Sequence, residues 1–74
     1  MERYDFVAIV MEDRKGRILY LKASDKPSKE IVCEWTYDYD VAIYFNTNSE
    51  AEKFANSYFK SFKDWKLKDV YARV

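Results

Sequence analysis

The chain has 74 residues, 13 basic and 13 acidic side chains, and no histidine. A chain this short is expected to form one domain over residues 1–74, with a modest core, because small domains bury only about two-thirds of their unfolded surface. Hydrophobic residues make up 49% of the chain, which argues against intrinsic disorder. Zero net charge provides no long-range attraction to nucleic acid or to an anionic membrane.

Residues 6–11 form the longest uncharged apolar run, which is far shorter than the roughly 20 residues that span a bilayer. The opening MERYD lacks the basic and apolar regions of a signal peptide. We therefore expect a cytoplasmic protein with no membrane partner. A single cysteine, Cys33, and the absence of histidine argue against an internal disulfide and a zinc site, and no cofactor is expected.

Residues 4–11 and 17–22 are rich in apolar and β-branched side chains and predict two strands. The polar segment EDRKG lies between them and contains Gly16, the single glycine of the chain. Glycine adopts positive φ without steric cost, so this position favours a tight turn. The pattern predicts a β-hairpin.

Residues 23–29 form a polar loop around Pro27, and residues 30–36 then alternate as a third strand, with Ile31, Cys33 and Trp35 on one face. The apolar run at 41–45 fits either a turn of helix or a brief strand, because periodicity does not distinguish the two at this length.

Thr47 and Glu50 have the spacing of a helix capping box. The apolar residues that follow recur at helical spacing and predict one long amphipathic helix with lysines in its last turns. This stripe comprises Ala51, Phe54, Ala55, Tyr58, Phe59, Phe62 and Trp65. Residues 68–74 then predict a last strand, with Val70, Ala72 and Val74 on one face.

This element order predicts an α+β fold, in which a mainly antiparallel sheet of about four strands carries one amphipathic helix on one face. The first strand is apolar on both faces, although a single helix covers only one. Large exposed apolar patches are uncommon on small monomers. The second face is therefore expected to be covered either by residues 41–45 or by a partner chain, such as a second copy in a homodimer.

Eight residues carry a resemblance to small hypothetical proteins of bacteriophages and prophages. They follow the pattern W-T-x5-A-x2-F-x-T-x2-E-A-x2-F, which is met here at Trp35, Thr36, Ala42, Phe45, Thr47, Glu50, Ala51 and Phe54. The resemblance covers most of the chain in element order, from hairpin to last strand. It implies a phage-type accessory protein without enzymatic activity that binds a host protein, for example as an inhibitor of host defence or an anti-CRISPR protein.

The sequence shows no catalytic signature. Cys33 lies at a strand position where a buried cysteine packs as a small hydrophobe, and its charged neighbours are acids rather than the cations that activate a thiol. Asp38 and Asp40 resemble solvated loop acids more than a catalytic pair. One glycine cannot build a phosphate-binding loop. We expect that the protein is not an enzyme.

Residues 30–40 contain acidic and aromatic side chains and no basic residue. Aromatic side chains rimmed by charge are typical of protein-binding surfaces. The predicted partner-binding residues are Glu34, Tyr37, Asp38, Tyr39 and Asp40. The alternative is that Trp35 belongs to the core, that both tyrosines are half-buried, and that the acids serve solubility.

The end of the predicted helix is basic, and its lysines alternate with aromatic side chains. Such surfaces can bind single-stranded nucleic acid. The alternative nucleic-acid-binding residues are therefore Lys60, Lys63, Lys66 and Lys68. The opposing interpretation is that the aromatics Phe59, Phe62 and Trp65 are core and the lysines are solvated.

Overall fold

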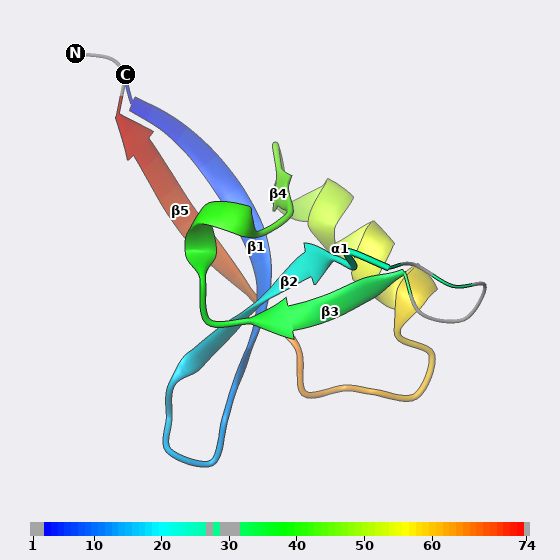
Figure 1. The fold of residues 1–74 in the computed structure, drawn as a ribbon. Coiled ribbons are helices and arrows are strands. Elements are labelled where there is room, and N and C mark those ends of the chain that lie inside the picture. The colour runs from blue at the N-terminus through cyan, green and yellow to red at the C-terminus, as the bar shows by residue number, and fades with distance from the viewer. Residues whose placement is uncertain (1–2, 27, 29–31, 74) are drawn as a thin grey trace.

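A computed structural model describes residues 3–26, 28 and 32–73 of the chain, with the backbone alone at positions 3–5 and 71–73 (Figure 1). Its antiparallel sheet and single α-helix confirm the predicted α+β class. The elements are the strands β1 (Arg3–Glu12), β2 (Ile18–Ala23) and β3 (Cys33–Thr36), the 3₁₀ helix η1 (Tyr39–Val41), the strand β4 (Tyr44–Phe45), the helix α1 (Asn48–Tyr58) and the strand β5 (Lys66–Arg73).

Strand β1 is the centre of a five-stranded antiparallel sheet. Along one edge it pairs with β5, from Arg3 opposite Arg73 to Val10 opposite Lys66. Along the other edge it pairs first with β4 and then with β2, and β3 extends the sheet beyond β2. The sequence predicted about four strands, and the two-residue strand β4 is the additional one.

The predicted hairpin is confirmed by the antiparallel pairing of β1 and β2. Gly16 has a φ of 81°, the positive value that the turn requires. The Asp13 carboxylate stabilises the turn by accepting hydrogen bonds from the backbone N–H groups of Lys15, at 2.8 Å, and of Arg17, at 2.9 Å.

Helix α1 begins where the capping box predicts. The Thr47 hydroxyl accepts the Glu50 N–H at 3.1 Å, and the Glu50 carboxylate accepts the Asn46 N–H at 3.3 Å, one residue before the usual position. The helix ends at Tyr58, however, so the prediction that it continues to Trp65 with lysines in its last turns is wrong. Phe59 is already extended, at φ −97° and ψ 97°.

Tertiary packing explains the early end of the helix. The Phe59 ring leaves the helical path and stacks on Trp35 of β3, with centroids 5.8 Å apart and planes 8° apart. Phe62 lies 6.2 Å from the same indole ring. The aromatic residues that repeat at helical spacing therefore converge on Trp35 from a loop, and the gain from packing outweighs the local helical pattern.

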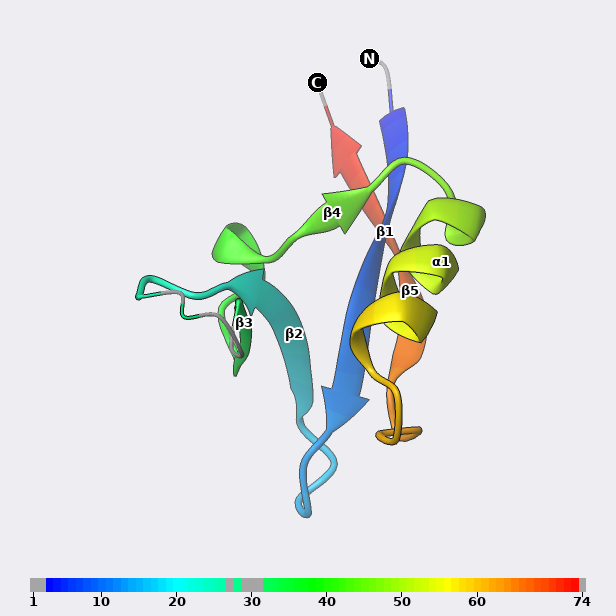
Figure 2. The same cartoon turned by 90° about the vertical axis from the view of Figure 1, so that its right-hand side faces the viewer.

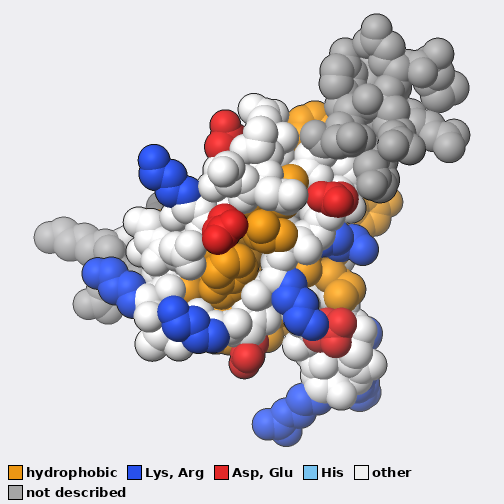
Figure 3. Space-filling model, turned by 180° about the vertical axis from the view of Figure 1, so that it is seen from behind, with side chains coloured by type: hydrophobic (Ala, Val, Ile, Leu, Met, Phe, Trp, Pro, Cys, Tyr) orange, Lys and Arg blue, Asp and Glu red, His pale blue; other side chains and the backbone are white. Residues whose placement is uncertain are grey.

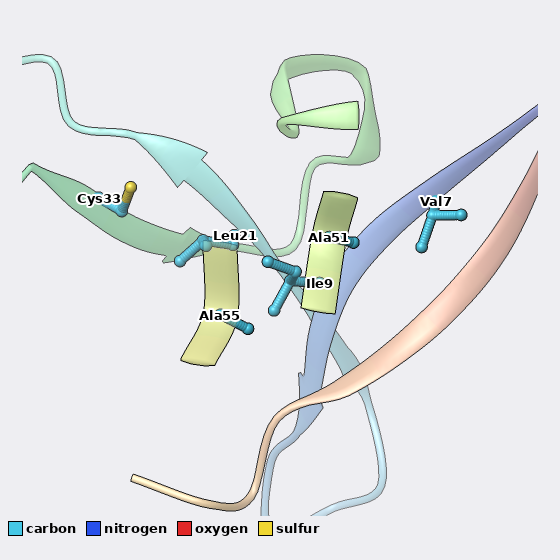
Figure 4. Close-up of a cluster of buried hydrophobic side chains, with 6 residues drawn as sticks. All are labelled: Val7, Ile9, Leu21, Cys33, Ala51 and Ala55. Carbon is cyan, nitrogen blue, oxygen red and sulfur yellow. The ribbon is translucent and has the colours of Figure 1, made fainter. Parts of the chain in front are cut away.

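One side of the sheet packs on α1 and contains the main core. The buried residues of this cluster are Val7, Ile9, Leu21, Cys33, Ala51 and Ala55 (Figure 4). Ile9, Ala51 and Ala55 have no exposed surface, because the small alanines let the helix approach the sheet closely. Half-buried aromatic side chains, including Trp35, Phe45 and Phe54, complete this side.

The third predicted strand is shorter than expected, since β3 covers only Cys33–Thr36, while Glu30 and Ile31 lie outside the described residues. The last strand begins at Lys66, two residues earlier than predicted. Val74 is outside the described part, as is the side chain of Ala72. Residues 41–45, for which the sequence allowed either a helical turn or a strand, contain part of each. Val41 ends η1, and Tyr44–Phe45 form β4.

The opposite side of the sheet is also covered. Ala8 and Val10 alternate with the core residues of β1, yet they are 0% and 4% exposed. In Figure 2, η1 and α1 lie on opposite sides of β1. The Tyr39 ring of η1 contacts Tyr20, which pairs with Val10, and Tyr44 of β4 pairs with Ala8. Tyr39 and Tyr44 therefore lie on the second face, which the sequence left to residues 41–45 or to a partner, whereas Ile43 and Phe45 of that run pack on the helix side.

Candidate functional site

Residues Tyr37–Val41, which we call the tyrosine turn, carry exposed aromatic and apolar side chains. Tyr37 is 52% exposed, Tyr39 is 58% exposed and Val41 is 48% exposed. Among the described residues, the one other large hydrophobic side chain with comparable exposure is Val32, at 43%. Exposed apolar side chains are ordinary when scattered, but three of them within one five-residue turn form a local surface.

The backbone of the tyrosine turn is fixed by its own side chains. The Asp38 carboxylate accepts the N–H of Asp40 at 2.9 Å, which caps η1. The N–H of Asp38 in turn donates to the Thr36 hydroxyl at 3.1 Å. Short polar side chains that bond the backbone two residues away favour turns over strands, which explains why β3 stops before YDYD.

Tyr37 anchors the turn to the β1–β2 hairpin. Its hydroxyl donates to the Asp13 carboxylate at 2.8 Å and accepts from the Arg17 guanidinium at 3.3 Å. The guanidinium also lies 4.8 Å from the centre of the Tyr37 ring and pairs with Asp13 at 2.8 Å. These contacts hold two loops together that are more than 20 residues apart in sequence.

The hydrogen bonds of this cluster shift the pKa values of Asp13 and Tyr37. The pKa of Asp13 falls to about 2, chiefly because the backbone N–H of Arg17 donates to its carboxylate, with further bonds from Tyr37 and Arg17 side chains. The pKa of Tyr37 is raised, first by its hydrogen bond to Asp13. The contacts therefore favour the ionised form of Asp13 and the neutral form of Tyr37.

Tyr39 contacts the sheet on one side, and more than half of its surface is exposed to solvent. The Tyr44 hydroxyl donates to the Tyr39 carbonyl, and the ring centroids of Tyr39 and Tyr20 are 6.4 Å apart. The pKa of Tyr44 is raised by burial and then by the nearby Tyr20 and Asp40. The turn is thus supported by two tyrosines of the sheet while its own rings face solvent.

The structure brings four of the five predicted partner-binding residues together. Tyr37, Asp38, Tyr39 and Asp40 are all exposed in one turn, so the alternative that both tyrosines are half-buried is wrong. Glu34 is exposed on β3, but Lys22 contacts its carboxylate at 3.3 Å and also contacts Asp25 at 3.3 Å.

Trp35, between these residues in sequence, packs on the helix side as the core alternative predicts.

The alternative lysine residues are not on a helix. Lys60 and Lys63 lie in the loop after α1, and Lys66 and Lys68 are on β5. The prediction of a basic end of the helix is therefore wrong. Lys63 and Lys66 border a surface pocket together with Met11, Glu12, Asp64 and Trp65. Two carboxylates therefore balance the two lysines at this pocket.

Cys33 is buried, and burial raises the pKa of its thiol, the opposite of the shift that makes a cysteine nucleophilic. Its backbone N–H donates to the Tyr58 hydroxyl at 3.3 Å, which ties β3 to the helix. No group of three or more metal-ligating side chains occurs in the described part of the chain.

The sequence interpretation missed two parts of this site. The contact of Tyr37 with Asp13 and Arg17 joins distant segments, and a single sequence contains no signal for such a pairing. The exposure of Val41 could not be predicted, because all five residues of VAIYF are apolar and the pattern does not indicate which of them face solvent. Asp13, placed three residues before Gly16 and four before Arg17, was the one local hint, since aspartate often organises a turn that ends in glycine.

No family model, curated protein or solved structure matches this chain. The 11-residue α1 is also too short to cross a bilayer, and no other described helix could do so.

Proposed function

We propose that this protein is a small non-enzymatic accessory protein that binds another protein through the tyrosine turn. The observation that carries the proposal is the simultaneous exposure of Tyr37, Tyr39 and Val41 within five residues. Tyrosine is enriched among the residues that dominate binding energy, because its ring buries a large area while its hydroxyl stays solvated.

The rigidity of the turn also supports this proposal. Binding normally costs free energy because side chains and loops lose freedom when the complex forms. Here Asp38 caps η1, Tyr37 is held by Asp13 and Arg17, and Tyr44 holds the Tyr39 carbonyl. A surface that is already ordered before binding loses less entropy on association.

The resemblance to small phage proteins supports a more specific role. It favours a phage-encoded protein in the host cytoplasm that binds or inhibits a host protein, in a defence-related or anti-CRISPR-type function. A second copy of the chain is the other candidate partner, since the same tyrosines can form a homodimer contact.

Affinity capture from a bacterial lysate tests the proposal when the bait is compared with two variants. Tyr39→Ala removes the most exposed ring of the turn, and Val32→Ala removes an exposed apolar side chain outside it. A stoichiometric partner retained by wild type and Val32→Ala but lost by Tyr39→Ala supports the proposal. A partner captured equally by all three baits contradicts it. Light scattering on each pure protein identifies self-association.

The pocket beside Trp65 favours one alternative, a nucleic-acid-binding accessory protein. Trp65, Lys63 and Lys66 all line this pocket, and an indole ring that stacks a base beside lysines that contact phosphates is one way of binding a single strand. Titration with single-stranded DNA at low salt tests this function, with affinity expected to fall steeply as salt rises. Absence of binding at low salt, or binding unaffected by Lys63→Ala plus Lys66→Ala, would remove the alternative.

A further inference from the structure

The contact between the hairpin and the tyrosine turn contains a complete arginine-recognition arrangement within the protein itself. Arg17 lies 4.8 Å from the Tyr37 ring centre, donates to the Tyr37 hydroxyl, and pairs with the Asp13 carboxylate at 2.8 Å. A planar guanidinium suits this setting, because it can stack on a ring and donate to a carboxylate at once.

A second tyrosine and a second aspartate, Tyr39 and Asp40, are neighbours in sequence two residues further along. Tyr39 is 58% exposed, and Asp40 follows it directly and is exposed. Tyr20 contacts the Tyr39 ring, with the centroids 6.4 Å apart and the planes tilted by 58°, which leaves the ring open to solvent elsewhere. Within the described residues, the Asp40 carboxylate has no hydrogen bond or ion pair, whereas Asp38 uses one oxygen to cap η1.

The cations bordering the turn are already engaged. Arg17 is paired with Asp13, and Lys22 lies 3.3 Å from both Asp25 and Glu34. The exposed tyrosines therefore lie beside acids whose charge these two cations do not offset. Charge complementarity selects a cationic partner segment, since like charges brought to such a surface would repel.

We infer that the partner protein supplies an arginine to the tyrosine turn, with its guanidinium stacked on the Tyr39 ring and donating to the Asp40 carboxylate. This inference rests on the proposed function and specifies the chemistry of its partner. Lysine is the weaker choice, because its ammonium group is a hydrated point charge that cannot stack flat on a ring. The protein thereby recognises an exposed, arginine-containing protein segment.

The inference is tested by NMR titration of the isotope-labelled protein with two capped peptides, Gly-Arg-Gly-Arg-Gly and Gly-Lys-Gly-Lys-Gly. The arginine peptide should shift the amide signals of residues 37–41 and bind about threefold more tightly than the lysine peptide of equal charge, because a guanidinium stacks flat on a ring and an ammonium does not. Equal binding of both peptides, or shifts confined to other residues, would overturn the inference.

Two variants and one control separate the contributions. Tyr39→Leu should abolish the preference for arginine, and Asp40→Asn should weaken the binding of both peptides, while Glu52→Gln, an exposed acid on α1, should leave both affinities unchanged. Equal weakening of both peptides in the control would show a general charge effect and refute the assignment. Because these residues are exposed, unchanged amide spectra away from the turn would show that each variant is folded.

The peptide titration tests the arginine inference, and the lysate capture tests the proposed function, so their results distinguish the two. A partner captured in a Tyr39-dependent manner, together with no arginine preference in the titration, would leave the proposed function standing and reject the arginine. An arginine preference without any Tyr39-dependent partner would retain the local chemistry and reject the proposed function.

Discussion

The two sides of the sheet solve the same packing problem in different ways. On the helix side, α1 brings two alanines down onto Ile9 and surrounds the contact with half-buried aromatic rings. On the other side, a turn and a two-residue strand cover Ala8 and Val10 and leave tyrosines at the surface. Figure 3, seen from behind, shows that an apolar patch on the helix side is ringed by charged side chains. The helix side is built for stability, whereas the turn side combines cover with an accessible surface.

The largest effect is expected at the centre of the helix side. Ile9→Ala should lower the free energy of unfolding by about 2 to 5 kcal/mol, because Ile9 has no exposed surface and its removal leaves a cavity against α1. Such a loss is a large part of the total for a small domain. Urea denaturation followed by circular dichroism measures it, and a variant as stable as wild type would refute the location of the core.

Phe54 and Phe62 separate the true helix face from the longer one that the sequence suggested. Phe54→Ala should cost about 3 kcal/mol, since its ring packs on Phe45 and Tyr58 beneath the helix. Phe62→Ala should cost clearly less, because Phe62 lies in the loop and touches mainly Trp35 and Phe59. Equal losses in the two denaturation curves would favour a helix that continues past Tyr58.

The helix cap gives a smaller effect. Thr47→Ala should lower stability by about 1 kcal/mol, because the Glu50 N–H loses the hydroxyl that accepts its hydrogen bond. Thr47→Ser keeps that oxygen and should stay close to wild type. Thermal unfolding of the three proteins makes the comparison, and a serine variant as unstable as the alanine variant would exclude capping as the cause.

The cluster of Asp13, Arg17 and Tyr37 should make stability depend on acid pH. The pKa of Asp13 is lowered from 3.8 to about 2 in the folded protein, so its contribution is present above about pH 4 and is lost as the pH falls toward 2. Asp13→Asn should flatten this part of the curve of melting temperature against pH. An identical acid-induced fall in the variant would show that other carboxylates are responsible.

The smallest effect on stability is expected at the tyrosine turn itself. Tyr39→Ala should change the free energy of unfolding by less than about 1 kcal/mol, because more than half of the side chain is already solvated. The same change should reduce partner binding by about tenfold or more if Tyr39 is an anchor residue. Chemical denaturation and quantitative capture on one sample test both statements, and a large loss of stability would contradict the division between the two sides.

Local signals in the sequence were sufficient for the hairpin and the helix start. Gly16 identified the turn and Thr47 the cap because both act through neighbouring backbone groups. The helix end was not predictable in this way, since Phe59 leaves the helix to reach Trp35, a residue 24 positions earlier. The longer the sequence separation of a contact, the less a single chain reveals of it.

The candidate site shows the same limit. YDYD indicated a turn and an aromatic, acidic composition, but not that Tyr37 would be tied to Asp13 and Arg17 or that Tyr39 would stay exposed. The exposed fraction of a side chain depends on which other residues pack against it, and these contacts are set by the whole fold. Tyr44 and Tyr20 support the turn from the sheet and so determine which rings face solvent.

The most direct test of this account is to map the footprint of the captured partner on the protein by amide chemical shifts. The account predicts that the largest shifts fall in the tyrosine turn, residues 37–41, and that the helix Asn48–Tyr58 is little affected. A footprint centred on α1 and the aromatic side chains around it would contradict the account and assign binding to the side that we describe as structural.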